Sequence, residues 1–546
     1  MNRASSRKLN ILTDLALLLL IAGFAFFVNR GIKIKGLYMH DLYMWSCYGE
    51  QSVWEFAFPI GTSTRFRPVY WLATYLQMMI VGTHITRFVT FNIVCNILAA
   101  WLVFKFAKDL ARCRWAGFGA ALCYLSSRFA YYQIGQALGL METMALVMAI
   151  VILYLLYIFI EKGWEQPESL VFGDSVRDRD RQLRYRAKDR GSLWFLAAVL
   201  IWFLLCFTHE RYISLFPLFY LALAVRMLQQ PEGLRIRSVR DRVVLWAVPA
   251  VTLALVVLIR SFAIGKALPA GTGGTEVTET FHIGECIRYC FSQVLYIFGV
   301  NDGPEHLNGL PWDQTPPGIK RMTKFSVLFI GLICIAFAFC FFLDLFKGKK
   351  KETARRLAVS LLFFSFIALC IGCSSVTIRV EMRWIYVSYT AALLYASWMI
   401  GEIAGEEGIH VKRILVTALF YGYVALSVYC NIFYRAWFPK LYFWPNQLRM
   451  NSLAEETVEK YGTEGIFGKD IYILENTYQM TDFYGRTFFK PYDPEKKAEG
   501  TAVIFADGPE DVTLQDVREG KAIVLKEIPE ENAYRDVTDE FLQEKN

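Results

Sequence analysis

The sequence has few charged residues. Asp, Glu, Lys and Arg make up 20% of its 546 residues, whereas hydrophobic residues make up 55% and aromatic residues 16%. An ordinary soluble domain is about 25% charged. Apolar windows of roughly 20 residues recur between charged or Pro/Gly-rich segments, and this is about the length that crosses a bilayer core. The composition therefore argues against a soluble protein and predicts a chain that crosses the membrane several times.

Several motifs are missing as well. The sequence contains no phosphate-binding P-loop, which argues against a nucleotide-driven pump, and no Gly-x-Ser-x-Gly elbow of a serine hydrolase. It has no internal repeat of the kind that builds a solenoid. Cys370 and Cys373 lack the second pair that a zinc site needs, so packing is the expected role. The formal charge of +8 lies in short loops, where membrane topology explains it better than a nucleic-acid partner.

The apolar windows predict about eleven membrane helices. The first follows a basic start without a small-residue cleavage site, so we expect a retained helix rather than a signal peptide. The expected helices lie near residues 11–29, 86–106, 115–132, 137–161, 193–208, 211–228, 243–263, 324–346, 357–374, 384–401 and 412–433.

Loop charge predicts the orientation, because Lys and Arg gather in cytoplasmic loops. With the N-terminus inside, all four cation-rich loops fall on the cytoplasmic side: FKFAKDLARCRW, VRDRDRQLRYRAKDRGS, RMLQQPEGLRIRSVRDR and LFKGKKKETARR. We therefore predict a multi-pass protein of the cell membrane. It has a transmembrane domain over 1–434 with outer loops near 30–85 and 265–323, and an extracytoplasmic tail over 435–546.

Two outer segments have a predicted structure. Residues 66–82 are apolar but short, with Pro59 before them and Pro68 near their start, which favours a juxtamembrane or re-entrant helix. The tail is acidic, and it contains an amphipathic helix pattern, LRMNSLAEETVEKYG, followed by the strand-like stretches IYILE, TAVIFAD and KAIVLKE. We expect a small soluble α/β domain there. The fold class is thus an all-α polytopic membrane protein with a small α/β domain.

Ionisable residues near the outer helix ends are the candidate site, because charges at membrane depth are functional candidates. The alternative for each is an interfacial charge paired with a neighbour or with a lipid headgroup. These residues are His40, Asp41, Glu50, Arg65, Arg67, His209, Glu210, Arg211, Glu381 and Arg383.

The start of the chain resembles GT-C glycosyltransferases, especially the protein O-mannosyltransferases that carry tetratricopeptide repeats. The similar segments are YMHDLYMW, RFRPVYWLATYLQ and the helix RFVTFNIVCNILAAWLVFKFAKDL with Asn92. Two later segments follow in the same order: LLCFTHERYISLFPLF, with Glu210 and Pro217 at family positions, and VEMRWIYVSYT. In the second of these, Glu381, Arg383 and Tyr386 are looser counterparts. The resemblance covers residues 1 to about 400.

The sequence also departs from this family. His40 occupies one position of the usual acidic pair, His209 stands where the family has Lys, and Met382 interrupts the Glu-Arg match. No tetratricopeptide repeats follow. The acceptor is therefore left open as a glycan, a lipid or a protein.

The resemblance implies transfer of a sugar from a polyprenyl-phosphate donor to an acceptor on the outer face, with inversion. Asp41 is then the expected general base, with Glu50 as the second choice. Arg67, Arg211 and Arg383 are candidates for binding the donor phosphate, since a guanidinium matches phosphate oxygens in pairs. The implied partners are the lipid-linked donor, the acceptor and membrane lipids.

Other readings remain open. His40, Asp41, His209 and Glu210 are competent ligands for a divalent metal, although we expect no cofactor. A transporter or lipid-linked glycan flippase would also place charges in a membrane cavity, but such proteins typically show paired repeats and broken helices. The large outer loop at 265–323 keeps a polysaccharide polymerase open.

Overall fold

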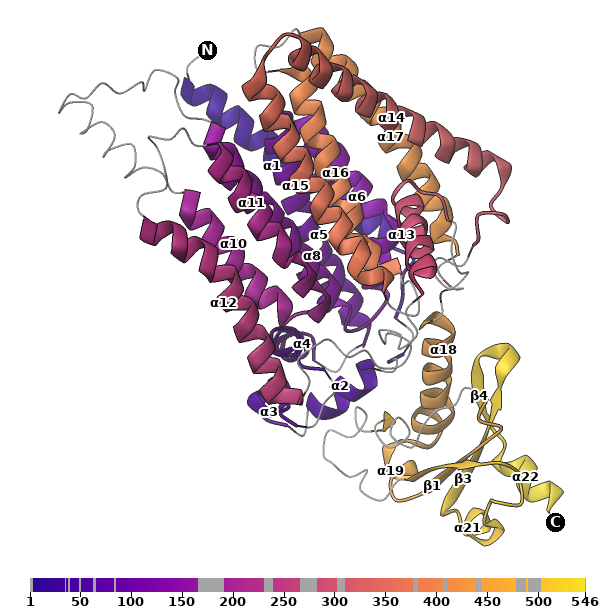
Figure 1. Cartoon of the computed structure of the whole chain (residues 1–546). Helices are drawn as coiled ribbons and strands as arrows, with labels where there is room; N and C mark the ends of the chain where they lie inside the picture. Colours follow the sequence, from indigo (N-terminus) through magenta and orange to yellow (C-terminus); the bar gives the residue numbers. More distant parts are fainter. Residues whose placement is uncertain are drawn as a thin grey trace.

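The computed structural model describes residues 3–34, 36–37, 40–48, 51–61, 65–82, 85–164, 191–229, 239–265, 282–301, 310–376, 382–405, 410–437, 439, 441, 443–477, 488–489 and 502–545. Long helices form one bundle, and a small domain with a sheet is attached at one end of it (Figure 1). The N-terminus lies at the opposite end of the bundle from this domain. The expected combination of a helical membrane domain and a small α/β domain is confirmed.

All eleven predicted windows are helical, but their number as membrane spans is not confirmed. Among the described residues, eight helical segments are long and apolar enough to cross a membrane. Three windows fail that criterion: 193–208 is a shorter helix, 384–401 lies in a helix of mixed polarity, and 115–132 is divided at Ser127.

The helices of the bundle are α1 (Arg3–Asn29), α5 (Ile85–Ala111), α6 (Arg114–Ser126), α7 (Arg128–Ile134), α8 (Leu140–Trp164), α10 (Gly191–Cys206), the 3-10 helix η1 (Glu210–Leu215), α11 (Phe216–Leu228), α12 (Val239–Ile264), α14 (Pro317–Phe346), α15 (Lys350–Ser375), α16 (Met382–Ala404) and α17 (His410–Arg435).

Helix α5 lies in the middle of the bundle and packs against α1, α6, α8 and α16. Glycines allow two of these approaches. A Cβ atom added at Gly117 of α6 would lie 2.6 Å from the carbonyl oxygen of Phe104, and one at Gly401 of α16 would clash with the carbonyl oxygen of Leu110. Small residues let membrane helices approach backbone to backbone, which increases their van der Waals contact.

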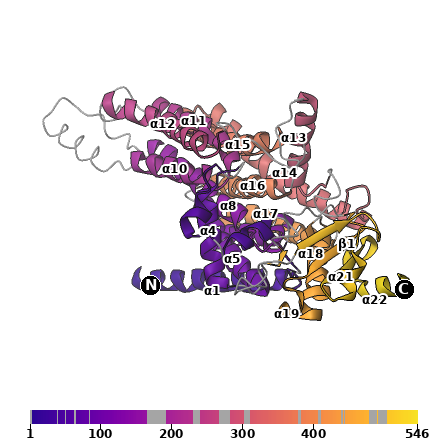
Figure 2. The same cartoon turned by 90° about the horizontal axis from the view of Figure 1, so that it is seen from below.

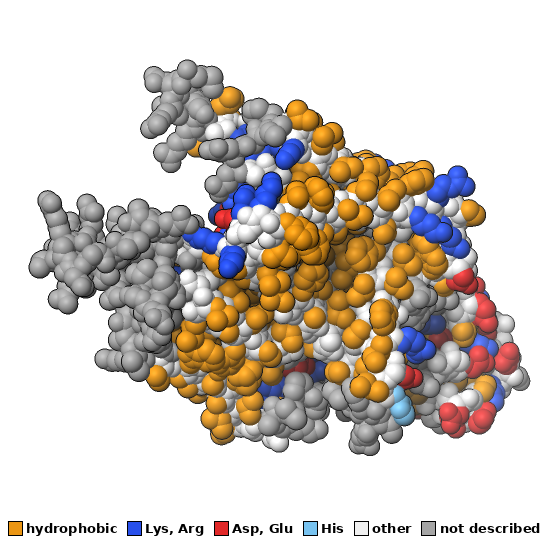
Figure 3. All heavy atoms as spheres, turned by 45° about the horizontal axis from the view of Figure 1, so that its top comes forward, with side chains coloured by type: hydrophobic (Ala, Val, Ile, Leu, Met, Phe, Trp, Pro, Cys, Tyr) orange, Lys and Arg blue, Asp and Glu red, His pale blue; other side chains and the backbone are white. Residues whose placement is uncertain are grey.

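The outer surface of the bundle is apolar. Leu12, Leu19, Leu258, Phe339 and Ile414 are among its exposed side chains. Figure 3 shows a broad apolar expanse over the helices, with Lys and Arg in patches toward its edges. A soluble monomer rarely exposes so large an apolar surface to water, whereas the lipid chains of a membrane would cover it. The chain is therefore an integral membrane protein.

The end of the bundle that carries the small domain is covered by short helices. These are α2 (His40–Tyr48), α3 (Val53–Ala57) and α4 (Pro68–Val81). A capping box between Ser52 and Glu55 starts α3, and Pro68 at the first position starts α4. Helix α4 is seen nearly end-on in Figure 1, so it lies across the axes of the long helices. The short helix expected at 66–82, juxtamembrane or re-entrant, is present as α4.

The predicted outer loop at 265–323 contains an additional helix, α13 (Ile283–Ile297), and it ends early because α14 begins at Pro317. One face of α13 carries the exposed residues Ile283, Ile287 and Phe291, while Gln293 is buried against α15. The other face of α13 packs on α15 and α16. The sequence analysis did not predict this helix, because its apolar residues lie along one face of the helix and do not form a continuous apolar window.

The tail forms the α/β domain. Its sheet has the order β2-β1-β3-β4, with β1 parallel to β2 and β3, and β4 antiparallel to β3. The first three strands are the predicted stretches, and the sequence reading missed the short β4. The elements are α18 (Phe443–Ala454), the π-helix η5 (Glu455–Glu459), α19 (Thr463–Ile466), β1 (Asp470–Leu474), β2 (Ala502–Ala506), α21 (Leu514–Arg518), β3 (Ala522–Ile528), the 3-10 helix η7 (Pro529–Glu531), β4 (Ala533–Asp536) and α22 (Thr538–Glu544).

Helix α18 joins the domain to the bundle. Gln447 donates to the carbonyl oxygen of Gly135 at 2.8 Å, and the backbone of Gly36 lies so close that a Cβ atom there would be 2.7 Å from the Gln447 carbonyl oxygen. On the other side, Ser452 accepts a hydrogen bond of 2.8 Å from the backbone N–H of Tyr534 on β4. Figure 2, which views the molecule from this end, shows α18 between the bundle and the sheet.

Candidate functional site

Most of the described candidate residues gather at the end of the bundle that carries the short helices. Asp41 lies on α2, Arg65 and Arg67 precede α4, His209 to Arg211 begin η1, and Arg383 is in the first turn of α16. Glu50 and Glu381 lie outside the described residues, and so does the side chain of His40. The N-terminal loop and η1, distant in sequence, thus meet at one membrane face.

Arg67 and Glu210 form the central ion pair of this site. Arg67 donates from Nε to Oε2 of Glu210 at 2.7 Å and from Nη2 to Oε1 at 2.6 Å. Both side chains are buried, with 6% and 9% of their surfaces exposed. Two parallel charge-assisted bonds fix the orientation of both groups. The pair therefore ties the loop before α4 to η1.

A second ion pair lies beside the first. Arg211 donates from Nη2 to Oε2 of Glu142, at the start of α8, and to the Tyr212 hydroxyl at 2.9 Å. Sequence analysis did not select Glu142, although it is an acidic residue at the end of an apolar window. Both ion pairs agree with the alternative role considered for these arginines. Arg67 and Arg211 are largely neutralised by carboxylates before any ligand binds.

His209 lies between the two ion pairs. Its Nδ1 is 3.9 Å from Oε2 of Glu210, and its Nε2 is 3.9 Å from Oε1 of Glu142. Nδ1 also accepts a hydrogen bond of 3.4 Å from the backbone N–H of Arg211. Burial, together with the guanidinium groups of Arg211 and Arg67, holds the pKa of His209 well below its usual value of 6.5. The imidazole is therefore neutral at physiological pH and acts as a helix cap.

Asp41 is buried, and its carboxylate is oriented by the backbone. Its Oδ1 accepts a hydrogen bond of 3.3 Å from the N–H of Leu138. The charges of Asp41, Arg67 and Arg383 all act on the neighbouring Tyr70, so these groups surround the same part of α4. The structure thus brings Asp41 and Arg383 to the edge of the Arg67–Glu210 pair.

The turn that contacts Asp41 is itself firmly held. Tyr70 donates to the carbonyl oxygen of Leu138 at 3.2 Å, and Asn92 donates to the carbonyl oxygen of Gln136 at 2.7 Å. Gln77 on α4 donates to Asn92 at 3.1 Å. Asn92, which the sequence analysis noted because of the family resemblance, therefore supports the turn that positions Asp41.

Arg260 is a buried cation of this site that the sequence analysis did not select. Arg260, near the end of α12, is 1% exposed, and its Nε and Nη1 atoms have no hydrogen-bond partner among the described residues. It lies within electrostatic range of Glu210, Arg67 and Cys206. An ionisable residue inside an apolar window was the available signal. Arg260 therefore has two nitrogen atoms in reserve for an anion, whereas Arg211 has only Nη1 without a partner among the described residues.

The sequence left open a metal site formed by His40, Asp41, His209 and Glu210. The structure does not test this site as a whole, because it does not describe the His40 side chain. Within the described part of the chain, no group of three or more His, Cys, Asp or Glu side chains is placed to hold a metal ion. Glu210 is also held at both oxygens by Arg67, which leaves it poorly disposed to be a ligand.

Comparison with known proteins gives matches only among solved structures. No protein-family model matches the sequence, and no curated protein matches it. The oligosaccharyltransferase from Archaeoglobus fulgidus, tethered with an acceptor peptide, is 10% identical, with 94% of this chain and 68% of that chain covered and a TM-score of 0.42.

Two further structures are similar at the same level. Archaeal oligosaccharyltransferase AglB from Archaeoglobus fulgidus, in complex with an inhibitory peptide and a dolichol-phosphate, is 10% identical over 94% of this chain and 69% of that chain, with a TM-score of 0.45. ArnT from Cupriavidus metallidurans, bound to undecaprenyl phosphate, is 12% identical over 94% and 92%, with a TM-score of 0.44. At this distance the likeness assigns no substrate and no residue role to this chain.

Proposed function

We propose that this protein is a GT-C-type glycosyltransferase that transfers a sugar from a polyprenyl-phosphate donor to an acceptor hydroxyl at the extracytoplasmic membrane face. One observation carries the proposal. A buried, oriented carboxylate, Asp41, and a buried guanidinium, Arg260, flank the same Arg67–Glu210 pair at one end of a membrane bundle, and Nε and Nη1 of Arg260 have no partner among the described residues. A glycosyl transfer from a lipid phosphate requires a base and a cation near each other at this depth.

In the proposed reaction, Asp41 accepts the proton of the acceptor hydroxyl while its oxygen attacks the anomeric carbon. The bond between that carbon and the phosphate oxygen breaks, the polyprenyl phosphate leaves with the electron pair, and the configuration inverts. The hydrogen bond from Leu138 holds the carboxylate in a fixed orientation. General base catalysis of this kind is typically worth about 10² to 10⁴ in rate.

Arg260 and Arg383 are the proposed cations for the leaving phosphate. The carboxylates of Glu210 and Glu142 already pair with the charges of Arg67 and Arg211, so these arginines mainly set the geometry of the site. Nε and Nη1 of Arg260, which have no partners in the described structure, would gain charge-assisted bonds to phosphate oxygens. Stabilising the charge that develops on the leaving group lowers the barrier of the chemical step.

The test uses the purified full-length protein in nanodiscs with synthetic polyprenyl-phosphate sugars. We expect Asp41→Asn to lower the transfer rate at saturating donor by about 10² or more. Asp109→Asn is the matched control, because Asp109 lies at the other end of the bundle, where it accepts a hydrogen bond from Tyr154. Arg260→Gln should weaken the transfer while Arg260→Lys restores part of it.

The outcome also decides between classes of protein. If the folded wild type neither transfers nor hydrolyses any donor but moves a labelled lipid or solute across liposomes, the transporter or flippase reading replaces the enzyme. If transfer occurs but Asp41→Asn leaves its rate unchanged, Asp41 is not the base. We propose that the reaction needs no metal, so chelation with EDTA should leave the rate unaltered.

A further inference from the structure

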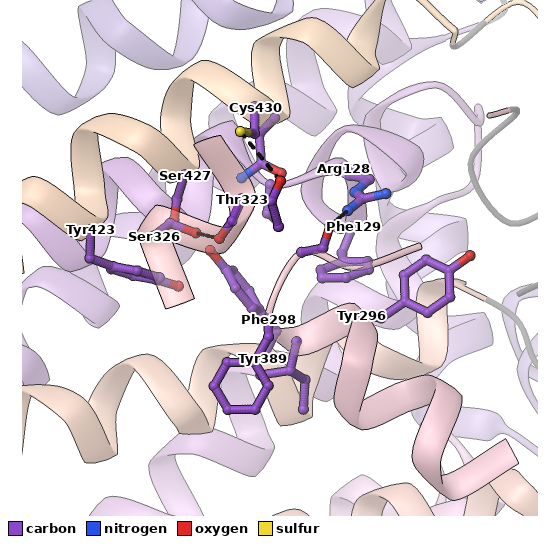
Figure 4. A pocket seen from close by; sticks show the side chains of 14 residues that line it. Arg128, Phe129, Tyr296, Phe298, Thr323, Ser326, Tyr389, Tyr423, Ser427 and Cys430 are labelled. Carbon is purple, nitrogen blue, oxygen red and sulfur yellow. Dashed lines mark hydrogen bonds between the residues drawn. The ribbon is translucent and has the colours of Figure 1, made fainter. Parts of the chain in front are cut away.

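A polar pocket lies on the side of the bundle formed by α7, α13, α14, α16 and α17. Its volume is about 400 Å³ with the open mouth included. Figure 4 shows Arg128 at its edge and several hydroxyl groups around it. The hydroxyl-bearing residues that line it include Ser127, Thr323, Ser326, Tyr389, Tyr423 and Ser427.

Arg128 provides the formal charge of this lining, since no other Lys or Arg and no Asp or Glu is among the described residues that line the pocket. Its side chain is 2% exposed. The guanidinium carbon lies 4.1 Å from the ring centre of Tyr434 and 5.6 Å from that of Tyr296, and Nη2 donates to the carbonyl oxygen of Gly299 at 3.2 Å. Its Nη1 has no hydrogen-bond partner within the described structure.

Like Arg260, Arg128 differs from the arginines of this chain that are paired with carboxylates. Arg67 is paired with Glu210, and Arg355 and Arg356 are both paired with Glu402. The described residues place no carboxylate within ion-pair distance of Arg128. The two tyrosine rings offset part of the cost of burying its charge, but they leave Nη1 without an acceptor.

We propose that this pocket binds a single oxyanionic group, a phosphate or a carboxylate, through Arg128 and the surrounding hydroxyls. An oxyanion supplies the missing acceptor and the missing negative charge together. The hydroxyls of Ser427 and Thr323 can donate to its remaining oxygens, because a hydroxyl rotates to suit its partner. Thr323 would give up its weak hydrogen bond of 3.6 Å to the Cys430 sulfur. This site is separate from the proposed catalytic site and does not depend on it.

The position of the pocket indicates two possible sources of the anion, a lipid and the aqueous solution. Arg128 begins α7, at the same end of the bundle as Arg435, whose guanidinium donates to the carbonyl oxygen of Leu125 at 2.8 Å. At the membrane face, the group can be the headgroup of an anionic lipid or a free anion from solution. Both present the same chemistry to Arg128.

The experiment compares four full-length proteins: wild type, Arg128→Gln, Ser427→Val and the control Arg114→Gln. Arg114 donates to Asn10 at 2.6 Å at the other end of the bundle, so its substitution removes the same charge elsewhere. Native mass spectrometry measures retention of phosphatidylglycerol against phosphatidylcholine. Thermal unfolding in detergent, with sodium phosphate against sodium chloride at equal ionic strength, measures free phosphate.

We expect one bound anion in wild type and in Arg114→Gln. Arg128→Gln should weaken its binding about 10- to 100-fold, the equivalent of one charge-assisted hydrogen bond, and Ser427→Val should weaken it less. Selective retention of phosphatidylglycerol identifies a lipid headgroup, whereas stabilisation by phosphate identifies a free anion.

Equal binding by all four proteins, or no anion binding by wild type, overturns the proposal. Arg128 would then serve only as a structural cation between two tyrosine rings. If Arg128→Gln does not fold, the comparison of Ser427→Val with Arg114→Gln decides the question, because Ser427 makes none of the contacts that hold Arg128 to Tyr434, Tyr296 and Gly299.

Discussion

Removing the charge of Glu210 should strongly destabilise the protein. Glu210→Gln keeps the shape of the side chain but leaves the Arg67 guanidinium buried without its counter-ion. The side chains of both residues are less than a tenth exposed, and both carboxylate oxygens accept from Arg67. Breaking a buried pair by altering one partner costs about 3 to 5 kcal/mol. That is a change of about 10² to 10⁴ in the folding equilibrium, at 1.4 kcal/mol per tenfold.

Denaturant or thermal unfolding of the purified protein in detergent micelles measures this loss. Glu519→Gln is the control, because Glu519 pairs with Lys521 on an exposed surface, where such pairs contribute little. We expect that control to unfold like the wild type. A Glu210→Gln protein that unfolds within about 0.5 kcal/mol of the wild type would refute the reasoning, since this is the usual range of a neutral surface change.

A double-mutant cycle separates the ion pair from general damage. Arg67→Met and Glu210→Met should each destabilise, because each leaves one buried charge alone. The double variant leaves none, and a buried pair replaced by apolar residues is often tolerated. We therefore expect the double variant to be more stable than the sum of the single changes predicts, by about 1 kcal/mol or more. Additive effects would mean that the two groups do not interact as the geometry indicates.

Three further predictions concern the rest of the molecule. Gly401→Leu should lower stability by about 1 to 3 kcal/mol or more, measured by thermal unfolding, because any side chain there meets the backbone of α5. Arg435→Met should loosen the ends of α1 and α6, whose carbonyl oxygens at Val28 and Leu125 accept from Arg435, and hydrogen exchange at these helix ends should rise at least tenfold. In the tail, burial acts to raise the pKa of Asp536, but hydrogen bonds from Lys460, Thr538 and Tyr461 outweigh it and lower the pKa. The resulting stability is present above the ordinary carboxyl pKa of about 4 and is lost as the pH falls below it, so hydrogen exchange of β3 and β4 should rise with acidification in the wild type and much less in Asp536→Asn.

The sequence alone determined the elements that depend on local pattern. Each of the eleven apolar windows became helical, because a run of apolar residues in lipid must satisfy its backbone hydrogen bonds internally. The stretches IYILE, TAVIFAD and KAIVLKE became β1, β2 and β3, whose alternate residues face opposite sides of the sheet. The number of spans was less certain, because α6, α10 and α16 are too short or too polar for length and composition to decide.

The site depended on contacts that no local pattern contains. The predicted topology brought Arg67 and Glu210 into one list of candidates, but 143 residues separate them. Only the folded chain, in which α4 packs against α8, showed that they bind each other. Conversely, Arg260 and Arg128 looked like parts of apolar helices until the folded chain left each of them buried with a donor to spare. Whether a buried cation has a counter-ion is a property of the tertiary structure, because its neighbours come from distant segments, and this decided which arginines are available to a ligand.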